Sequence, residues 1–266
     1  MVLTMTKGTV TSADGTQITY EYTGDGPAVI LVGGALTDRS AGKPLATALA
    51  DHFTTYVFDR RGRRDSGDTP PYALGREIED LAALCDAAGG EAFLYGVSSG
   101  AVLAFEAVAA GLPVPRLAMF EPPYVFAPED PDPAAQREHL QRLLAEDRRG
   151  EALEYFLREA VGLPSETVAS MQQGPMWAAL EALAHTLVYD LTVVGDGRVP
   201  VDRMAAVAVP TLVLDSAASS PRLRRAAEAT AAALPAGAHR SLAGQFHEIP
   251  PQELAPVLTR FFRDRG

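Results

Sequence analysis

The sequence predicts an α/β protein with a mostly parallel central sheet, helices on both faces of that sheet, and an inserted helical cap. Apolar, β-branched runs alternate with helical patterns over the first 125 residues, an order typical of parallel sheets covered by helices. The alternation stops at the Pro- and acid-rich stretch APEDPDPAAQ and resumes after residue 200, which indicates a boundary on each side. We therefore expect a core of residues 1–125 and 201–266 and a cap of residues 126–200.

The first 125 residues begin with a hairpin signal and continue with buried strands. GTVTSADGTQITYEYTGDG alternates polar and β-branched residues around Asp14 and Gly15, which predicts a hairpin. Four further runs are apolar enough for strands buried on both faces: PAVILVGG, TTYVFDRRG, EAFLYG and RLAMFEPP. The segments between them have helical periodicity: KPLATALADHF, YALGREIEDLAALCDAAGG and SSGAVLAFEAVAAG.

The cap segment contains helical patterns only: AAQREHLQRLLAEDRRG, EALEYFLREAVG, SETVASMQQG and MWAALEALAHTLVYD. Its larger apolar side chains are candidates either for packing between helices or for the wall of an acyl pocket: Met171, Met176, Trp177 and Tyr189. Beyond the cap, two runs predict strands, VPTLVLDS and AHRSLAG. Two others predict helices, SPRLRRAAEATAAALP and PQELAPVLTRFFRD.

Composition and charge exclude several classes of function. The formal net charge is −11, which argues against nucleic acid or an anionic membrane as the main partner, because both attract clustered Lys and Arg. Cys85 is the only cysteine, so an internal disulfide or a thiolate metal cluster is excluded. The N-terminus lacks the apolar region of a secretory signal, and no run is long enough for a membrane span. We expect a cytoplasmic protein; no pattern indicates its oligomeric state.

No cofactor is expected. The glycine spacing of a dinucleotide-binding turn does not follow the first buried strand, and GALTDRSAGKP lacks the glycine spacing and the Ser or Thr of a phosphate-binding loop. The histidines and carboxylates do not have the spacing of metal ligands. In DRRGRRD and PRLRRAAE the arginines are interleaved with acids, so we expect structural or solvated charges there.

Ser98 lies at the centre of Gly96-Val97-Ser98-Ser99-Gly100, between a predicted strand and a predicted helix. A sharp strand-to-helix turn exposes the central side chain, and the flanking glycines avoid collisions between a Cβ and the neighbouring elements. The helix that follows directs its N-terminus at the hydroxyl, where developing negative charge is favoured. The pattern predicts that Ser98 is a nucleophile; the alternative is an ordinary glycine-rich turn.

Five stretches, in family order, resemble the α/β-hydrolase superfamily over nearly the whole chain: LVGGALTD, FDRRGRRDSGD, YGVSSGA, PTLVLD and GQFHEI. They resemble the oxyanion loop, the Asp-x-Arg-Gly-x-Gly-x-Ser stretch, the nucleophile elbow, the late strand and the histidine-bearing loop of that superfamily. Arg64 stands where a second glycine is usual. The resemblance implies an α/β-hydrolase fold with a cap. A serine in place of a nucleophilic aspartate argues against epoxide hydrolase or dehalogenase chemistry.

A serine hydroxyl needs a base within hydrogen-bond reach, and the resemblance and the chain order, serine before histidine, indicate His247. The other histidines fall on predicted helices or on a predicted strand: His52, His139, His185 and His239. The chemistry also needs two N–H donors for the oxyanion. The resemblance implies Ser99, which follows the nucleophile, and Ala35 by register, with Leu36 as the next choice.

The acid that would orient the histidine has two candidates. The usual family position lies a few residues beyond PTLVLD, where this chain has about Ser219, and Asp215 comes several residues too early. Some family members carry the acid at the end of the strand that follows the nucleophile helix, which is Glu121 here. A carboxylate there would select the imidazole tautomer and stabilise the imidazolium. We predict Glu121; the alternatives are Asp215 and the absence of any functional acid.

The expected activity is hydrolysis of a carboxylic ester, a lactone or a related small acyl compound, with Ser98 as nucleophile, His247 as base and Glu121 as acid. Because the usual acid position is lost, a non-hydrolytic tailoring activity such as a lyase or a cyclase is the alternative. A catalytically silent, ligand-binding homologue is a third interpretation, since one fold supports several functions.

Overall fold

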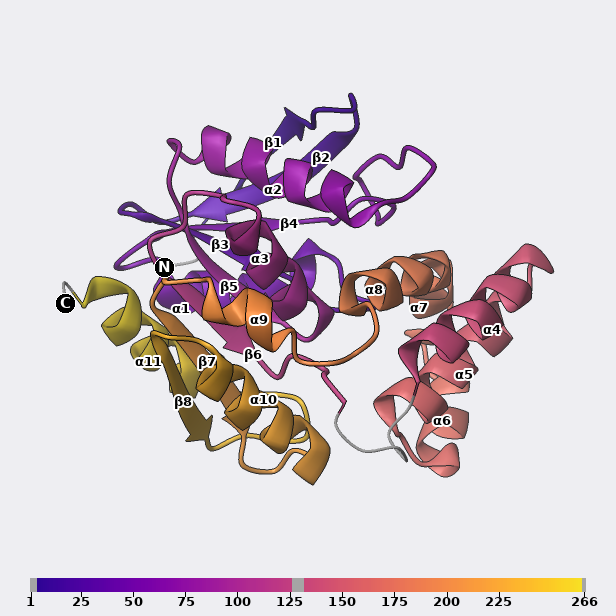
Figure 1. Ribbon diagram of the computed structural model, residues 1–266. Helices are drawn as coiled ribbons and strands as arrows, with labels where there is room; N and C mark the ends of the chain where they lie inside the picture. The colour runs from indigo at the N-terminus through magenta and orange to yellow at the C-terminus, as the bar shows by residue number, and fades with distance from the viewer. Residues whose placement is uncertain (1–3, 126–131, 265–266) are drawn as a thin grey trace.

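An eight-stranded sheet forms the centre of the computed structural model, which describes residues 4–125 and 132–264 (Figure 1). The strand order is β1-β2-β4-β3-β5-β6-β7-β8, and only the pairs β1–β2 and β2–β4 are antiparallel. The strands are β1 Thr6–Thr11, β2 Gln17–Thr23, β3 Ala28–Val32, β4 Thr54–Phe58, β5 Phe93–Val97, β6 Leu117–Phe120, β7 Thr211–Ser216 and β8 Gly237–Leu242. The mostly parallel sheet that the sequence predicts is confirmed, as is the hairpin around Asp14 and Gly15.

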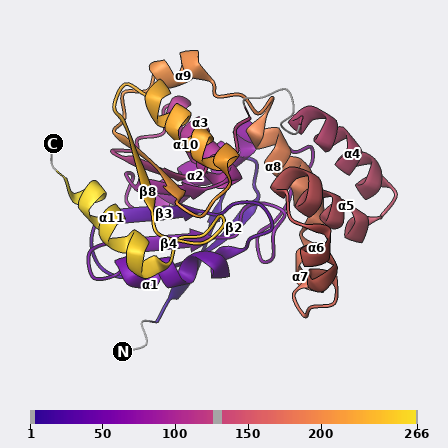
Figure 2. The ribbon, with the colours of Figure 1, turned by 90° about the horizontal axis from the view of Figure 1, so that it is seen from below.

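Helices cover both faces of the sheet (Figures 1 and 2). One face packs against α1 and α11, and the other packs against α2, α3 and α10. The core helices are α1 Lys43–Leu49, α2 Leu74–Ala87, α3 Ser99–Ala109, α9 Val201–Ala205, α10 Pro221–Ala233 and α11 Pro251–Arg263. Crossovers through these helices leave the carboxyl ends of the parallel strands at one edge of the sheet, where ligands bind in open α/β sheets.

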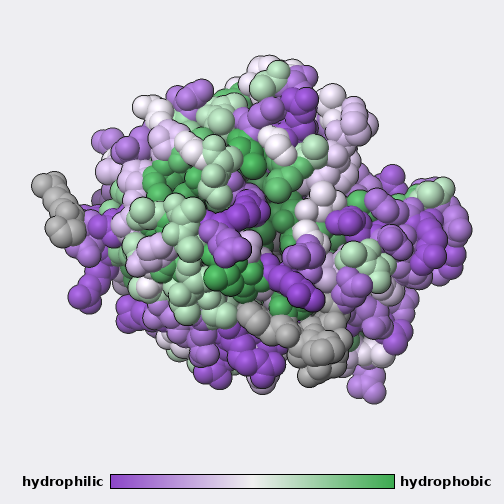
Figure 3. All heavy atoms as spheres, in the orientation of Figure 1, coloured by the Kyte–Doolittle hydropathy of each residue, from purple (hydrophilic) through white to green (hydrophobic). Residues whose placement is uncertain are grey.

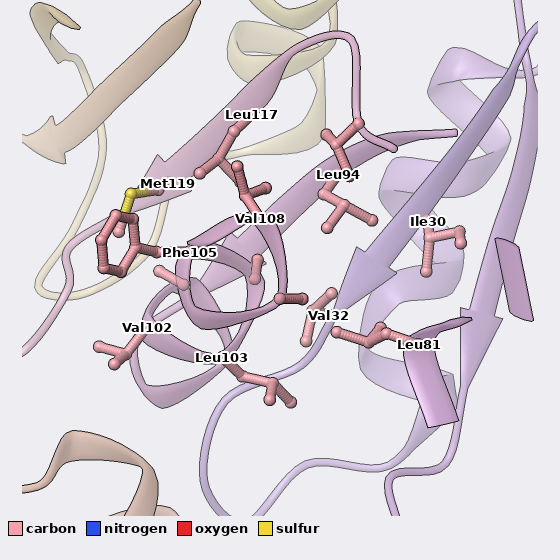
Figure 4. Packing of buried hydrophobic residues seen from close by; sticks show 14 of the residues in the cluster. Ile30, Val32, Leu81, Leu94, Val102, Leu103, Phe105, Val108, Leu117 and Met119 are labelled. Atoms are coloured by element: carbon pink, nitrogen blue, oxygen red, sulfur yellow. The ribbon is translucent and has the colours of Figure 1, made fainter. Parts of the chain in front are cut away.

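Helix α3 is the most deeply buried helix of the core, and ten of its eleven residues are buried. Figure 4 shows Phe105 and Val108 of α3 against Met119 and Leu117 of β6, within one cluster of buried apolar side chains. Removing this apolar surface from water is the main force that holds the helix in place. The start of α3, directly after Ser98, is therefore firmly positioned.

Between β6 and β7 the described residues contain helices and no strand. Besides α9, these are α4 Pro133–Ala145, α5 Arg149–Tyr155, a π-helical segment Phe156–Val161, α6 Ser165–Gln172, α7 Trp177–Ala182, a 3-10 helix Ala184–Thr186 and α8 Leu187–Val194. They share an apolar cluster of their own and lie to one side of the sheet, with a largely hydrophilic outer surface (Figures 1 and 3). We call the helices from α4 to α8 the cap. The expected first cap residue, Phe126, lies outside the described residues, and the domain boundaries 126–200 stay a prediction.

None of the helices in residues 4–125 and 132–264 combines the length and the apolar character that a membrane crossing requires.

Candidate active site

Ser98 occupies a strained turn between β5 and α3. Its backbone angles, φ 55° and ψ −123°, fall outside the regions that residues with a side chain ordinarily adopt. The Ser98 N–H donates to the carbonyl of Phe120 at 2.8 Å, and the Ser98 carbonyl accepts from the N–H of Ala101 at 2.9 Å. Strain of this kind persists only where the surroundings hold it, and it is concentrated at functional sites.

The glycines that flank this turn are required by close backbone contacts. A Cβ on Gly96 would lie 2.3 Å from the carbonyl oxygen of Gly100, and one on Gly100 would lie 2.4 Å from that of Val32. Gly34 also lies close to this turn, because a Cβ added there would lie 3.2 Å from the Cβ of Ser98. The loop after β3, which the sequence analysis assigns to the oxyanion site, therefore runs directly beside Ser98.

The two adjacent serines have different environments. Ser98 is partly exposed and lines a cavity, whereas the Ser99 side chain is buried. The Ser99 hydroxyl donates to Asp190 Oδ1 at 2.7 Å. Only the Ser98 hydroxyl thus remains available to a ligand, as expected for the central residue of the turn.

His247 and Glu121 are in direct contact, although they are 126 residues apart in the sequence. The His247 Nδ1 lies 2.5 Å from Glu121 Oε2, and Glu121 Oε1 accepts the N–H of Ser216 at 2.8 Å. Glu121 is fully buried, while the His247 side chain is 28% exposed. The ring of Phe120 stacks on the imidazole at 5.6 Å between centroids. The imidazole is therefore held by its Nδ1 side, which leaves Nε2 for proton transfer.

Asp215, the alternative acid, binds elsewhere. Its carboxylate contacts His239 Nε2 at 2.5 Å and accepts the hydroxyl of Ser241 at 2.6 Å, so it faces β8. Ser219, at the usual family position of the acid, accepts the backbone N–H of His247 at 2.9 Å. Ser219 thus supports the backbone of the loop that carries His247, and the imidazole ring of His247 is paired with Glu121.

A cavity of about 90 Å³ brings the predicted site residues together. Ala35, Ser98, Ser99 and His247 all line it. The rest of its wall is mostly apolar and comes largely from the cap, with Phe156, Ala160, Val161, Leu191 and Val194 among the lining residues. Its lining residues come mainly from the loops at the carboxyl ends of β3, β5 and β6 and from α4, α8 and the segment Phe156–Val161.

The four apolar cap residues proposed from the sequence, all of them described, do not line this cavity. Met171 and Trp177 pack against the cap cluster, and Met176 is exposed. Tyr189 stacks on Tyr72 at 4.0 Å and donates its hydroxyl to Asp68. Other side chains of the helical segment form the wall instead, among them Phe156, Leu191 and Val194.

A group of buried charges beneath the cavity was missed by the sequence analysis. Arg60 donates two hydrogen bonds to Glu77, each at 2.7 Å, and one to Asp190 at 2.6 Å. Arg63 binds both oxygens of Asp190 at 2.9 Å. Both arginines and Asp190 are at most 2% exposed. The arginines of DRRGRRD were expected to be structural or solvated; these two are structural and adjoin the site.

The charges of this group stabilise one another. Burial alone would raise the pKa of the Asp190 carboxyl, but the charges of Arg63 and Arg60 outweigh it and hold that pKa below its ordinary value. Burial lowers the pKa of the Arg63 guanidinium, and the charge of Asp190 opposes this. Asp190 therefore supplies a negative charge that the buried arginines require.

Across residues 4–125 and 132–264, the structure contains no group of three His, Cys, Asp or Glu side chains arranged to hold a metal ion.

A protein-family model described as the alpha/beta hydrolase family matches residues 29–256. Among solved structures, an alpha/beta hydrolase from Sphaerobacter thermophilus is 53% identical, with a TM-score of 0.91 over 96% of this chain and 100% of that one. A thermophilic esterase from Thermogutta terrifontis is 25% identical, with a TM-score of 0.70 over 97% of both chains.

One curated relative is similar over part of its length. N-formylmaleamate deformylase from Pseudomonas putida is 36% identical over 125 residues. The match covers 45% of this chain and spans about half of that protein, 47%. It therefore carries less weight than the whole-chain structural matches.

Proposed function

Because the chain belongs to the alpha/beta hydrolase family, we propose that it is a serine hydrolase that cleaves a carboxylic ester, a lactone or a related acyl compound. Its relatives support hydrolase activity in general. One observation carries the finer proposal: Ser98 and His247 line a single cavity, and the carboxylate of Glu121 binds Nδ1 of the His247 imidazole, which leaves Nε2 free for proton transfer.

In the proposed reaction, Ser98 Oγ attacks the carbonyl carbon while His247 Nε2 takes the hydroxyl proton. The carbonyl oxygen, now negative, accepts hydrogen bonds from the backbone N–H groups of Ala35 and Ser99. The tetrahedral intermediate collapses, the leaving group takes the proton from His247, and an acyl group remains on Ser98. Water then attacks the acyl carbon and gives a proton to His247; collapse of the second tetrahedral intermediate returns that proton to Ser98 Oγ and releases the acid.

The cavity suggests a small acyl group. Its volume of about 90 Å³ is well below the roughly 300–1,000 Å³ of sites for drug-sized ligands. His247 also borders a larger, mostly apolar cavity of about 390 Å³, but Ser98 does not line that cavity. We therefore assign the acyl group to the smaller cavity, which Ser98 and His247 share. The deformylase relative is named for removal of a formyl group, the smallest acyl group, which is in line with this assignment.

The test combines covalent labelling with ester turnover. Wild type should be labelled by a fluorophosphonate probe and should hydrolyse p-nitrophenyl acetate faster than the octanoate. Ser98→Ala should abolish labelling and lower kcat by at least about 10³-fold. Ser170→Ala, a control at an exposed serine of α6, should change neither.

Other outcomes would favour the alternatives. Labelling without turnover of any ester would favour a lyase or cyclase that uses the same pocket. Neither labelling nor turnover in wild type would favour a ligand-binding protein and would contradict the hydrolase. The contact between Glu121 and His247 supports the hydrolase over the lyase or cyclase, because loss of the usual acid position was the reason to consider that alternative.

A further inference from the structure

The carboxylate of Asp190 lies where the cap meets the catalytic loops. Asp190 belongs to α8, yet its side chain is 1% exposed and contacts three residues of the core. Arg63 Nη2 donates to both of its oxygens, Arg60 Nη1 lies 2.6 Å from Oδ1, and the Ser99 hydroxyl lies 2.7 Å from the same atom.

Arg63 extends this contact to the loop after β3. Its Nη1 donates to the carbonyl oxygen of Gly34 at 2.5 Å and to that of Thr37 at 3.0 Å. The Gly34 carbonyl and the Ala35 N–H belong to one planar peptide group, in which they point in opposite directions. Holding the carbonyl therefore fixes the direction of the Ala35 N–H.

The second expected donor is held by the same carboxylate. The Ser99 hydroxyl is bound by Asp190 directly, and the Ser99 N–H is the first of the helix α3. The hydroxyl bond limits rotation of this residue at the start of the helix. One carboxylate from the cap thus restrains both N–H groups, one through Arg63 and the other through Ser99.

We propose that Asp190 is a positioning residue that fixes both N–H donors of the oxyanion hole. This inference rests on the proposed function, since it concerns the donors of the proposed reaction. Preorganised donors stabilise the transition state because they need not reorient as charge develops. Asp190 is among the residues that line the cavity, but its side chain is 1% exposed and is bound by Arg60, Arg63 and Ser99. We expect it to act on the reaction through Arg63 and Ser99, so its loss should weaken transition-state binding more than substrate binding.

The experiment compares Asp190→Asn with a matched control, Asp80→Asn. Asp80 is also buried and also accepts two hydrogen bonds from an arginine, Arg61, at 2.7 and 2.8 Å. It lies on α2 and lines neither cavity beside His247. Both variants remove the charge that pairs with a buried guanidinium, so both should lower the melting temperature. Only Asp190→Asn should also affect catalysis.

For Asp190→Asn we expect kcat on p-nitrophenyl acetate to fall by about 10- to 100-fold, part of the effect of losing a donor outright. KM should stay within about twofold. Inhibition by methylboronic acid, whose adduct with Ser98 places an anionic oxygen at the donors, should weaken by a similar factor. Asp80→Asn should keep the wild-type kcat, KM and inhibition by methylboronic acid.

If Asp190→Asn has the same kcat on p-nitrophenyl acetate as Asp80→Asn, the inference is overturned. If this variant does not fold, Ser99→Ala decides, because it removes one bond to Asp190 and leaves the ion pairs. It should lower kcat several-fold at constant KM, and an unchanged kcat would overturn the inference. Absence of Ser98-dependent turnover in wild type is a distinct result, which contradicts the proposed function itself.

Discussion

At the scale of single residues, the site separates groups that look alike in the sequence. Ser98 and Ser99 are adjacent, but the turn leaves one hydroxyl at the cavity and buries the other against Asp190. Glu121 and Asp215 both follow or end buried strands, yet one binds His247 and the other binds His239. The role of each group depends on its hydrogen-bond partner, not on its residue type.

The acid can be tested by two isosteric changes. Glu121→Gln keeps an oxygen for the N–H of Ser216 but replaces the charge beside His247, so the imidazolium loses its stabilising partner. We expect kcat on p-nitrophenyl acetate to fall by about 10²- to 10⁴-fold. Asp215→Asn should leave kcat within about threefold, because Asp215 binds residues of β8. Collapse of the rate in the Asp215 variant alone would assign the acid to Asp215.

At the scale of elements, the junction of β5 with α3 depends on close backbone packing. The first turn of α3 lies against the end of β3, and a Cβ on Gly100 would meet the carbonyl oxygens of Val32 and Gly33 at 2.4 and 2.5 Å. Backbone atoms cannot move aside as the end of a flexible side chain can. Glycine at this point therefore keeps the turn at Ser98 and the loop after β3 in contact.

Two Gly→Ala changes in helices should act in opposite directions. Gly100→Ala should lower stability by a few kcal/mol, as overpacking does, and should reduce kcat because it displaces the loop that leads to Ala35. Gly75→Ala, on the exposed side of α2 with no atom within 4 Å of the new Cβ, should raise stability by about 0.4–1 kcal/mol. Urea unfolding measures both. Equal changes in unfolding free energy for Gly100→Ala and Gly75→Ala would contradict the argument that a Cβ at Gly100 collides with the backbone of β3.

At the scale of the whole molecule, buried ion pairs connect segments that are distant in the sequence. Asp190 joins α8 to Arg63 across 127 residues, and Glu21 of β2 pairs with Arg39 and Lys43. Burial would raise the pKa of each carboxyl, but its cationic partners outweigh burial and lower it. These pairs make the stability of the fold depend on pH.

The unfolding free energy should fall in acid. Because the pKa values of Asp190 and Glu21 are lower in the folded chain, their stabilisation is present above the unfolded values of about 4 and is lost as the pH falls below them. Burial raises the pKa of Asp80. Protonation of Asp80 on acidification therefore stabilises the folded chain, and it does so at a higher pH than that at which Asp190 and Glu21 lose their stabilising contribution. We expect a nearly constant melting temperature from pH 7 to about 5 and a fall of several degrees by pH 3.5.

The control for this prediction is Asp190→Asn, which should show a weaker dependence on pH than wild type because one of the responsible groups is gone. A melting temperature that is constant or rises between pH 5 and 3.5 would contradict the assignment of stability to these carboxylates. Calorimetry or circular dichroism at fixed ionic strength measures the effect.

From the sequence alone, the order of strands and helices and the turn at Ser98 could be predicted, and the structure has both; His247 was predicted as the base, and that role stays a prediction. These depend on local patterns: apolar periodicity, glycines at a tight junction, and position after the last strand. Glu121 could be predicted because it directly follows β6, the neighbour of β5 in the sheet. Parallel strands bring their carboxyl ends to one edge, so Glu121 had to lie near Ser98.

Only the tertiary structure decided which acid binds His247 and which charges lie beneath the cavity. Strand direction and register turn Asp215 toward Ser241 of β8, and a short apolar run does not reveal this orientation. The sequence left open whether Arg60 and Arg63 are structural or solvated, because their shared partner Asp190 is more than 120 residues away. A buried charge is tolerated only beside its counter-charge, and that pairing exists only once the cap has packed on the core.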